Sequence, residues 1–216
     1  MTLTEILIVA IPLIIAITFH EAAHGFVAYI CGDKTAKRMG RMTLNPLKHV
    51  DLIGTVLIPA TLVFLKAPFL FGYAKPVPIN PTQFFHYRSN LIFVAAAGPI
   101  MNIILAMLSW SIYIFIYPDP PYLVAALMYS IQVNLVLAVF NMIPLLPLDG
   151  GRVLSAVLPS PYDRKFMKLE RLGMFIILAL LALPSLTENF GVRVNPIGWF
   201  IYNGVQWLKN ILGVTF

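Results

Sequence analysis

Residues 3–30 read LTEILIVAIPLIIAITFHEAAHGFVAYI, and this long apolar run decides how the chain folds. A helix needs about 20 predominantly apolar residues to cross the hydrocarbon core of a bilayer, and the run exceeds that length. No Lys or Arg precedes Lys34, and the apolar stretch is too long for a secretory signal. We therefore expect a permanent membrane span that carries two histidines and a glutamate within it.

The composition of the whole chain also indicates a membrane protein. Of its 216 residues, 59% are hydrophobic and 11% are charged, and the mean hydropathy is +0.84. Soluble domains carry about 25% charged residues, so lipid must be the main solvent for this surface. We expect one membrane-embedded domain over residues 1–216, with a catalytic core at about 3–158 and C-terminal helices at about 166–213. The single cysteine, Cys31, excludes an internal disulfide.

Five further apolar segments predict an all-α polytopic membrane protein, a bundle of about five to six membrane segments. They cover residues 52–65, 91–117, 122–148, 172–186 and 197–212. The segment at 52–65 is short and interrupted by Pro59, so it is as compatible with re-entry into the membrane as with a crossing. Polar residues at helical spacing in the last segment make an interfacial position an alternative to a span.

The basic residues indicate how the segments are oriented. Thirteen of the fifteen Lys and Arg residues lie at 31–50, 66–88 and 150–171. Cytoplasmic loops carry the Lys/Arg excess, so the first segment should run from outside to inside, and residues 31–88 should be cytoplasmic at both ends. Glycine, proline and turn dipeptides between residues 32 and 81 predict short β-elements there. Because the basic residues form no cluster with interleaved aromatics, we expect no nucleic-acid partner.

The residues that point to chemistry are His20-Glu21-Ala22-Ala23-His24. Positions four apart lie on one face of a helix, with their Cβ atoms about 6 Å apart. His20 and His24 can therefore bind one metal ion, while Glu21 reaches a water beside it. The pattern also occurs by chance in soluble proteins. Within an apolar segment, however, ionisable side chains are costly and usually functional, which favours the metal site.

A catalytic zinc site needs a third protein ligand, and Asp149 is the strongest candidate. It ends the fourth apolar segment in the sequence NMIPLLPLDGG, residues 141–151. The prolines and glycines predict an unwound chain that can bring the carboxylate inward. The topology derived from charge places Asp149 and the histidine pair on the same side of the membrane. The alternative is an aspartate that only ends a helix in a turn.

These motifs resemble the site-2 protease family of intramembrane metalloproteases. That family joins a histidine–glutamate motif in a first span to an Asn-x-x-Pro…Leu-Asp-Gly element in a later span. Further matches are Asn45–Thr55, Gly72–Pro78 and Ala97–Asn102. The resemblance runs from about Leu3 to Leu158. It is greatest to the compact prokaryotic branch without a PDZ domain, since only Pro118–Pro121 join the two spans between which other members carry that domain.

The resemblance implies an enzyme that hydrolyses peptide bonds within or near transmembrane segments of membrane-protein substrates. His20, His24 and Asp149 would hold one Zn²⁺, and Glu21 would act as general base. Asn141 matches a family asparagine thought to bind the substrate backbone or the oxyanion. From the residues alone, an amide here is equally compatible with an oxyanion donor and with a hydrogen bond between helices.

The resemblance also implies a location. It indicates a prokaryotic plasma membrane, while the apolar segments and basic residues predict a multi-pass protein of the lipid bilayer with the active site towards the cytoplasm. A regulatory membrane partner is compatible with this assignment, but the sequence identifies none.

Other polar residues carry weaker indications. Asn102, one turn beyond the small residues Ala95–Gly98, is predicted to support a metal ligand or to pack between helices. His49 and His86 lie in loops without a partner at ligand spacing, which is typical of structural or solvated histidines. An unwound substrate is expected to add a strand to the β-elements predicted between residues 32 and 81.

Two other functions are compatible with the same cluster. A different membrane zinc endopeptidase would use a downstream glutamate as third ligand, but Glu170 and Glu188 stand in no motif. A metal transporter would need further polar residues along a path through the membrane. The outer halves of the third and fourth segments offer little beyond Ser109, Ser111, Ser130 and Gln132. A family member without proteolytic activity is disfavoured because the ligand set is complete.

Overall fold

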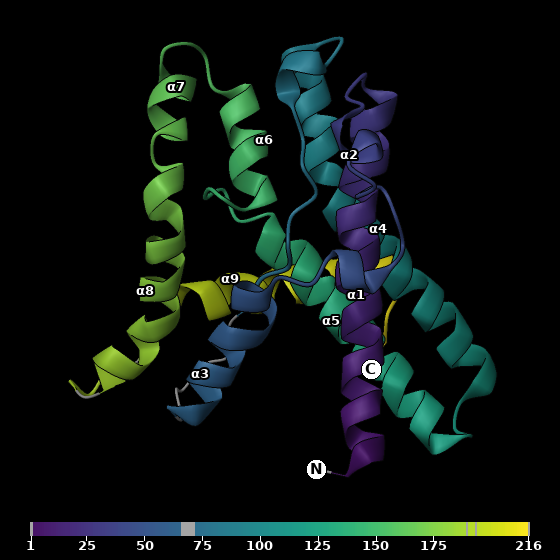
Figure 1. Ribbon diagram of the computed structural model, residues 1–216. Coiled ribbons are helices and arrows are strands. Elements are labelled where there is room, and N and C mark those ends of the chain that lie inside the picture. The colour runs from purple at the N-terminus through teal and green to yellow at the C-terminus, as the bar shows by residue number, and fades with distance from the viewer. Residues whose placement is uncertain (1, 66–71, 189, 193, 216) are drawn as a thin grey trace.

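Helices make up all the regular structure that the computed structural model describes, over residues 2–65, 72–188, 190–192 and 194–215 (Figure 1). Four of these helices are long and apolar enough to cross a membrane: α1 (Leu3–Ile30), α4 (Tyr87–Ile116), α5 (Pro121–Asn141) and α8 (Glu170–Glu188). The chain is therefore an integral membrane protein. The expected count of five to six membrane segments is not supported within the described residues.

Two of the predicted membrane segments form shorter elements. Residues 52–65 fold into a π-helix, η2 (Leu52–Leu57), continued by α3 (Ile58–Phe64). The seven residues of α3 rise only about 10 Å, too little to cross the hydrocarbon core. The last segment forms α9 (Pro196–Leu212), which runs across the direction of α1 in Figure 1. At 17 residues, α9 is at the lower limit for a span.

The first helix has the bounds that the sequence predicted. The Thr2 hydroxyl accepts from the Glu5 N–H at 3.3 Å, and the Glu5 carboxylate accepts from the Thr2 N–H at 2.9 Å. This capping box satisfies two backbone donors at the start of α1.

At the other end of α1, the side chain of Cys31 is buried, and burial raises the pKa of its thiol. Such a thiol is a poor metal ligand at neutral pH.

Helices α1, α4 and α5 pack against one another as the central group of the fold (Figure 1). Small residues allow the close approach of α4 to α1: Ala95, Ala97 and Gly98 are all buried. A side chain on Gly98 would collide with the imidazoles of His20 and His24. α4 therefore lies close to α1 at the level of the histidines.

The region between α1 and α4 contains no strand in its described residues, so the β-elements predicted there are not supported. It holds α2 (Thr35–Arg38), the 3-10 turns η1 (Pro46–Lys48) and η3 (Pro81–Gln83), and an irregular stretch at residues 72–80. Residues 66–71 lie outside the described part. The strand addition by substrate therefore stays a prediction, since no described strand offers it an edge.

Both backbone and side-chain groups hold the stretch at 72–80, and the N–H groups of Tyr73 and Lys75 donate to the carbonyls of Gly54 and His49. Arg41 donates to the carbonyls of Lys75 and Pro76 at 2.9 and 3.2 Å. The buried carboxylate of Asp33 accepts from the N–H of Asn80 at 2.6 Å. Prolines at 76 and 78 also remove backbone donors that a ladder would need. The stretch is thus extended without being a strand.

The segment predicted at 122–148 is helical only as far as Asn141. The chain then turns back on itself, and α6 (Asp149–Val157) begins at the candidate ligand. A side chain on Gly150 would collide with the Met142 carbonyl, so the turn depends on that glycine. Packing of α6 against α4 places Asp149 beside α1.

The chain continues through α7 (Tyr162–Met167) to α8, which stands apart from α1 in Figure 1. Only Gly173 and Ile177 of α8 are buried among the residues described. Most of its apolar surface is therefore available to lipid.

Candidate metal centre

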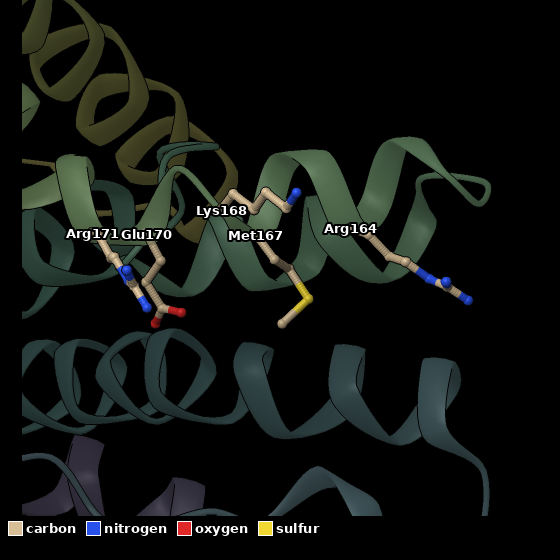
Figure 2. A pocket seen from close by; sticks show the side chains of 5 residues that line it. All are labelled: Arg164, Met167, Lys168, Glu170 and Arg171. Atoms are coloured by element: carbon tan, nitrogen blue, oxygen red, sulfur yellow. The ribbon is translucent and has the colours of Figure 1, made fainter.

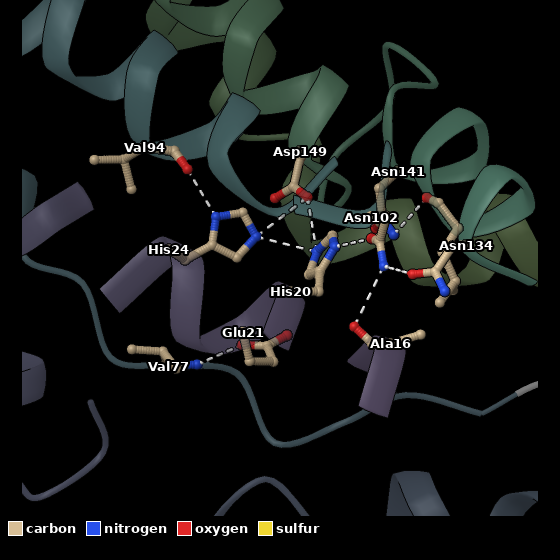
Figure 3. Close-up of polar contacts among 11 residues, drawn as sticks. Ala16, His20, Glu21, His24, Val77, Val94, Asn102, Asn134, Asn141 and Asp149 are labelled. Atoms are coloured by element: carbon tan, nitrogen blue, oxygen red, sulfur yellow. Dashed lines mark hydrogen bonds and ion pairs between the residues drawn. The ribbon is translucent and has the colours of Figure 1, made fainter. Parts of the chain in front are cut away.

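Three side chains from two elements converge on one point (Figure 3). His20 and His24 come from α1, one turn apart, and Asp149 comes from the first turn of α6. The two Nε2 atoms lie 3.1 Å apart, and Asp149 Oδ2 lies 3.2 and 3.3 Å from those of His20 and His24. Tetrahedral ligands about 2.0–2.1 Å from Zn²⁺ lie about 3.3 Å from one another. The triangle has the size that a zinc ion requires.

The hydrogen bonds on the far side of each ring orient the histidines. His24 Nδ1 lies 2.7 Å from the Val94 carbonyl, which can only accept, so Nδ1 carries the proton. His20 Nδ1 lies 2.6 Å from Asn102 Oδ1. Both rings therefore direct an Nε2 lone pair to the same point. Metal-binding histidines are typically fixed in this way, through the other ring nitrogen.

The carboxylate of Asp149 completes a donor set that suits a cation. Its Oδ2 atom is buried and finds no hydrogen-bond donor among the described residues. A buried carboxylate oxygen without a donor is costly, and here it faces two nitrogen lone pairs. A bound metal ion satisfies all three atoms together. The residues present therefore fit a zinc ion.

Glu21 lies beside this triangle without being part of it. Its carboxylate Oε2 accepts from the Val77 N–H at 2.9 Å, so the stretch at 72–80 passes next to the centre (Figure 3). Arg41 holds the preceding Lys75 and Pro76 carbonyls. The position of Glu21 is thus tied to a segment more than 50 residues away in the sequence.

Asn141 is the predicted site residue that the structure does not join to the centre by a hydrogen bond. Its Nδ2 donates to the Leu137 carbonyl within α5, at 3.0 Å. This bond lies within α5, and the role of Asn141 towards a substrate stays a prediction. His49 is buried, and its Nε2 contacts the Thr43 carbonyl at 2.9 Å, which agrees with a structural histidine.

One residue near the centre was missed in the sequence. Asn134 of α5 is 1% exposed and contacts Asn102, which itself contacts His20 (Figure 3). Its only signal was an amide in an apolar segment, and such residues are usually functional. Asn102 contacts the candidate ligand His20, and its predicted role in supporting a metal ligand stays a prediction.

A separate cavity of about 650 Å³ lies where α7 joins α8 (Figure 2). Its lining residues are Arg164, Met167, Lys168, Glu170 and Arg171. Glu170 forms an ion pair with Arg152 at 3.8 Å, and it is not part of the candidate ligand group of His20, His24 and Asp149. The cavity shares no residue with the metal centre.

The helical membrane fold and the buried ligand triangle define the class of the protein as a membrane metallopeptidase. The family model described as Peptidase family M50 matches residues 121–183, which include Asp149. YwhC of Bacillus subtilis (strain 168) is 39% identical over 182 residues, which cover 81% of this chain and 80% of YwhC. The chain belongs to peptidase family M50, and its resemblance to the site-2 proteases is confirmed.

More distant relatives cover nearly the whole chain. Rip2 of Mycolicibacterium smegmatis is 27% identical over 206 residues, 94% of this chain and 73% of Rip2. A zinc metalloprotease of Methanocaldococcus jannaschii is 26% identical over 211 residues, 94% of this chain and 50% of that protein. YwhC and Rip2 are named as candidate zinc metalloproteases. No solved structure gives a significant match.

Proposed function

We propose that the chain is a zinc-dependent intramembrane endopeptidase in which His20, His24 and Asp149 hold one Zn²⁺. The observation that carries this proposal is the buried triangle of His20 Nε2, His24 Nε2 and Asp149 Oδ2, with edges of 3.1–3.3 Å. Three protein ligands leave the fourth tetrahedral position open, which is the arrangement of catalytic zinc sites. The names of the relatives support zinc as the metal.

Glu21 is the general base of the proposed reaction. Zinc, when bound, supplies a Lewis acid that polarises a carbonyl and makes water nucleophilic near neutral pH. Glu21 follows His20 directly in α1, so its carboxylate can accept a proton from a water beside the ligand triangle and deliver it to the leaving amine. The bond from the Val77 N–H keeps one carboxylate oxygen oriented while the other is presented to water.

Asn141 is proposed to bind the substrate. It ends α5 immediately before the turn that leads to Asp149. Its amide uses one N–H towards the Leu137 carbonyl, which leaves a second N–H for a substrate carbonyl or an oxyanion.

The substrates are proposed to be transmembrane segments of other proteins. The metal centre lies between helices that cross the bilayer, and between His20 and the end of α1 at Ile30 the helix rises about 15 Å. The basic residues of 31–50 follow α1, and those of 150–171 lie in and after α6, which favours a centre open to the cytoplasm. Relatives from bacteria and an archaeon support a prokaryotic plasma membrane.

Metal content and peptide hydrolysis, measured on the same purified chains, test this function. Replacing His20, His24 or Asp149 singly by Ala should reduce zinc from about one ion per chain to a small fraction. Glu21→Gln should keep the zinc and lower hydrolysis of a transmembrane substrate by about 10²–10⁴-fold. An endopeptidase with another third ligand would keep its zinc in Asp149→Ala. A transporter would show no hydrolysis in the wild-type chain.

A further inference from the structure

A chain of buried hydrogen bonds leads from His20 away from the metal centre into α4 and α5 (Figure 3). His20 Nδ1 lies 2.6 Å from Asn102 Oδ1, and Asn102 Nδ2 lies 2.8 Å from Asn134 Oδ1. Asn134 Nδ2 in turn lies 2.9 Å from the backbone carbonyl of Ser130. Asn102 and Asn134 are 0% and 1% exposed. No water is needed to connect these groups.

The Ser130 carbonyl, at the far end of this series of hydrogen bonds, fixes which group donates and which accepts in each bond. A backbone carbonyl can only accept, so the Asn134 NH₂ group must face Ser130 and its oxygen must face Asn102. Asn102 then has to donate to Asn134, and it also donates to the Ala16 carbonyl at 3.3 Å. Its oxygen is left for His20, so the proton of the neutral imidazole is held on Nδ1. The Nε2 lone pair is thereby available to a metal.

Within the metal centre, Asp149 opposes this choice of His20 tautomer. Asp149 Oδ2 lies 3.2 Å from His20 Nε2, so without a metal the carboxylate would favour a proton on Nε2. That tautomer would leave Nδ1 as an acceptor facing the acceptor Asn102 Oδ1. Reversing the Asn102 amide to relieve the conflict would break its bonds to Asn134 and Ala16. Buried amides without partners are costly, so the two asparagines oppose the wrong tautomer.

We propose that Asn134 is a positioning residue of the metal centre, which acts through Asn102 to hold the Nε2 lone pair of His20 towards the metal. The proposal rests on the zinc site proposed above. Asn102 alone is a weaker anchor, because its other partner, the Ala16 carbonyl, is longer at 3.3 Å and belongs to α1 itself. By the α-helical pattern that carbonyl also accepts from the His20 N–H. Asn134 supplies a shorter bond from a different helix.

The test is zinc affinity, measured by chelator competition on the full chain in detergent. Asn102→Leu should weaken binding by about 10–100-fold, as is typical for groups that orient a ligand histidine. Asn134→Val removes the acceptor one step further away and should weaken binding by about 3–10-fold. Asn134→Thr has the same shape as the Val variant, but its hydroxyl can donate to the Ser130 carbonyl and accept from Asn102. The Thr variant should bind zinc more tightly than the Val variant.

A double-mutant cycle and a spectrum distinguish positioning from simple packing. If Asn134 acts through Asn102, Asn134→Val should cost nothing further in an Asn102→Leu chain, whereas independent packing effects would add. The visible absorption of the Co²⁺-substituted chain should shift in Asn134→Val and less in Asn134→Thr. Ser109→Ala is the control, because Ser109 Oγ lies 2.8 Å from Ser130 Oγ between the same two helices. It should leave affinity and spectrum unchanged.

Equal zinc affinity and identical Co²⁺ spectra in the wild-type, Asn134→Thr and Asn134→Val chains would overturn the proposal, as would additive effects in the cycle. Should the Val chain not fold, Asn134→Ser against Asn134→Ala provides the same comparison with smaller side chains. The proposed zinc site is contradicted by a different result: the wild-type chain binds no zinc, or the His20→Ala chain binds zinc as tightly as the wild-type chain does. If the wild-type chain binds zinc and the Asn134 substitutions have no effect on zinc affinity, only the positioning role of Asn134 is refuted.

Discussion

At the scale of single residues, the metal centre depends on hydrogen-bonding groups that hold each ligand side chain in one orientation. The Val94 carbonyl and the Asn102 amide fix the two imidazoles, and Asp149 Oδ2 is left without a donor in the described residues. Gly98 matters as much as the polar groups, since its missing side chain lets α4 approach the imidazoles. Geometry of this kind explains why the ligand atoms meet in a membrane interior, where unpaired polar groups are costly.

Gly98→Ala is expected to weaken zinc binding by about tenfold or more. The added methyl would collide with the His20 and His24 rings, and displaced ligands lose affinity much as they do when their orienting groups are removed. Chelator competition on the purified chain measures the change. Ser111→Thr adds one methyl at an exposed position of the same helix and should have no effect. Equal affinities for all three chains would show that the close approach is unimportant.

At the scale of elements, the sequence predicted what local pattern controls and missed what tertiary contacts control. The bounds of α1 and the helical pairing of His20 with His24 follow from one apolar run and one motif, and Asp149 follows from its own motif. The apolar segment was predicted to run to residue 148, because residues 142–148 are as apolar as the helix before them, but the prolines and glycines of 141–151 did predict that the chain unwinds before Asp149. The region at 32–81 was predicted to contain strands because its glycines and prolines resemble those of hairpins.

The structure shows why that prediction was wrong in the described residues. Some backbone groups at 72–80 bond to the side chains of Arg41, Glu21 and Asp33. Others bond to single backbone carbonyls of residues 49 and 54, outside any strand. Composition alone cannot show which partner a backbone group will find. Asn134 was missed for the same reason, since its role depends on Asn102 across a helix interface.

Arg41→Met is expected to lower hydrolysis by about tenfold while leaving zinc content unchanged. Without the guanidinium, the Lys75 and Pro76 carbonyls lose their donor, and the Val77 N–H no longer holds the Glu21 carboxylate in place. A misplaced general base loses part of a contribution of about 10²–10⁴. Zinc analysis and the rate of substrate cleavage should be measured together. Arg38→Met, on the exposed side of α2, is the control; an equal loss there would contradict the account.

At the scale of the whole molecule, charge and the position of the centre agree. The candidate ligands come from the second half of α1 and the start of α6, and basic residues follow both elements at 34–48 and 164–171. The loop between α4 and α5 holds no basic residue. By the positive-inside rule, we expect that loop to face outward and the basic residues to face the cytoplasm.

Thiol labelling in cells should confirm this orientation. In a Cys31→Ala background, Asp119→Cys between α4 and α5 should react with an impermeant maleimide on intact cells. Ser160→Cys between α6 and α7 should react only after the membrane is permeabilised. Both positions are exposed, so access to the reagent depends on the side of the membrane alone. The reverse pattern would place the centre on the outer side.

The most direct test of the central claim is a crystal structure of the zinc-loaded chain with anomalous diffraction at the zinc edge. The account predicts one buried peak about 2.0–2.2 Å from His20 Nε2, His24 Nε2 and one Asp149 oxygen. A peak bound elsewhere, or an Asp149 side chain turned away from the histidine pair, would contradict it.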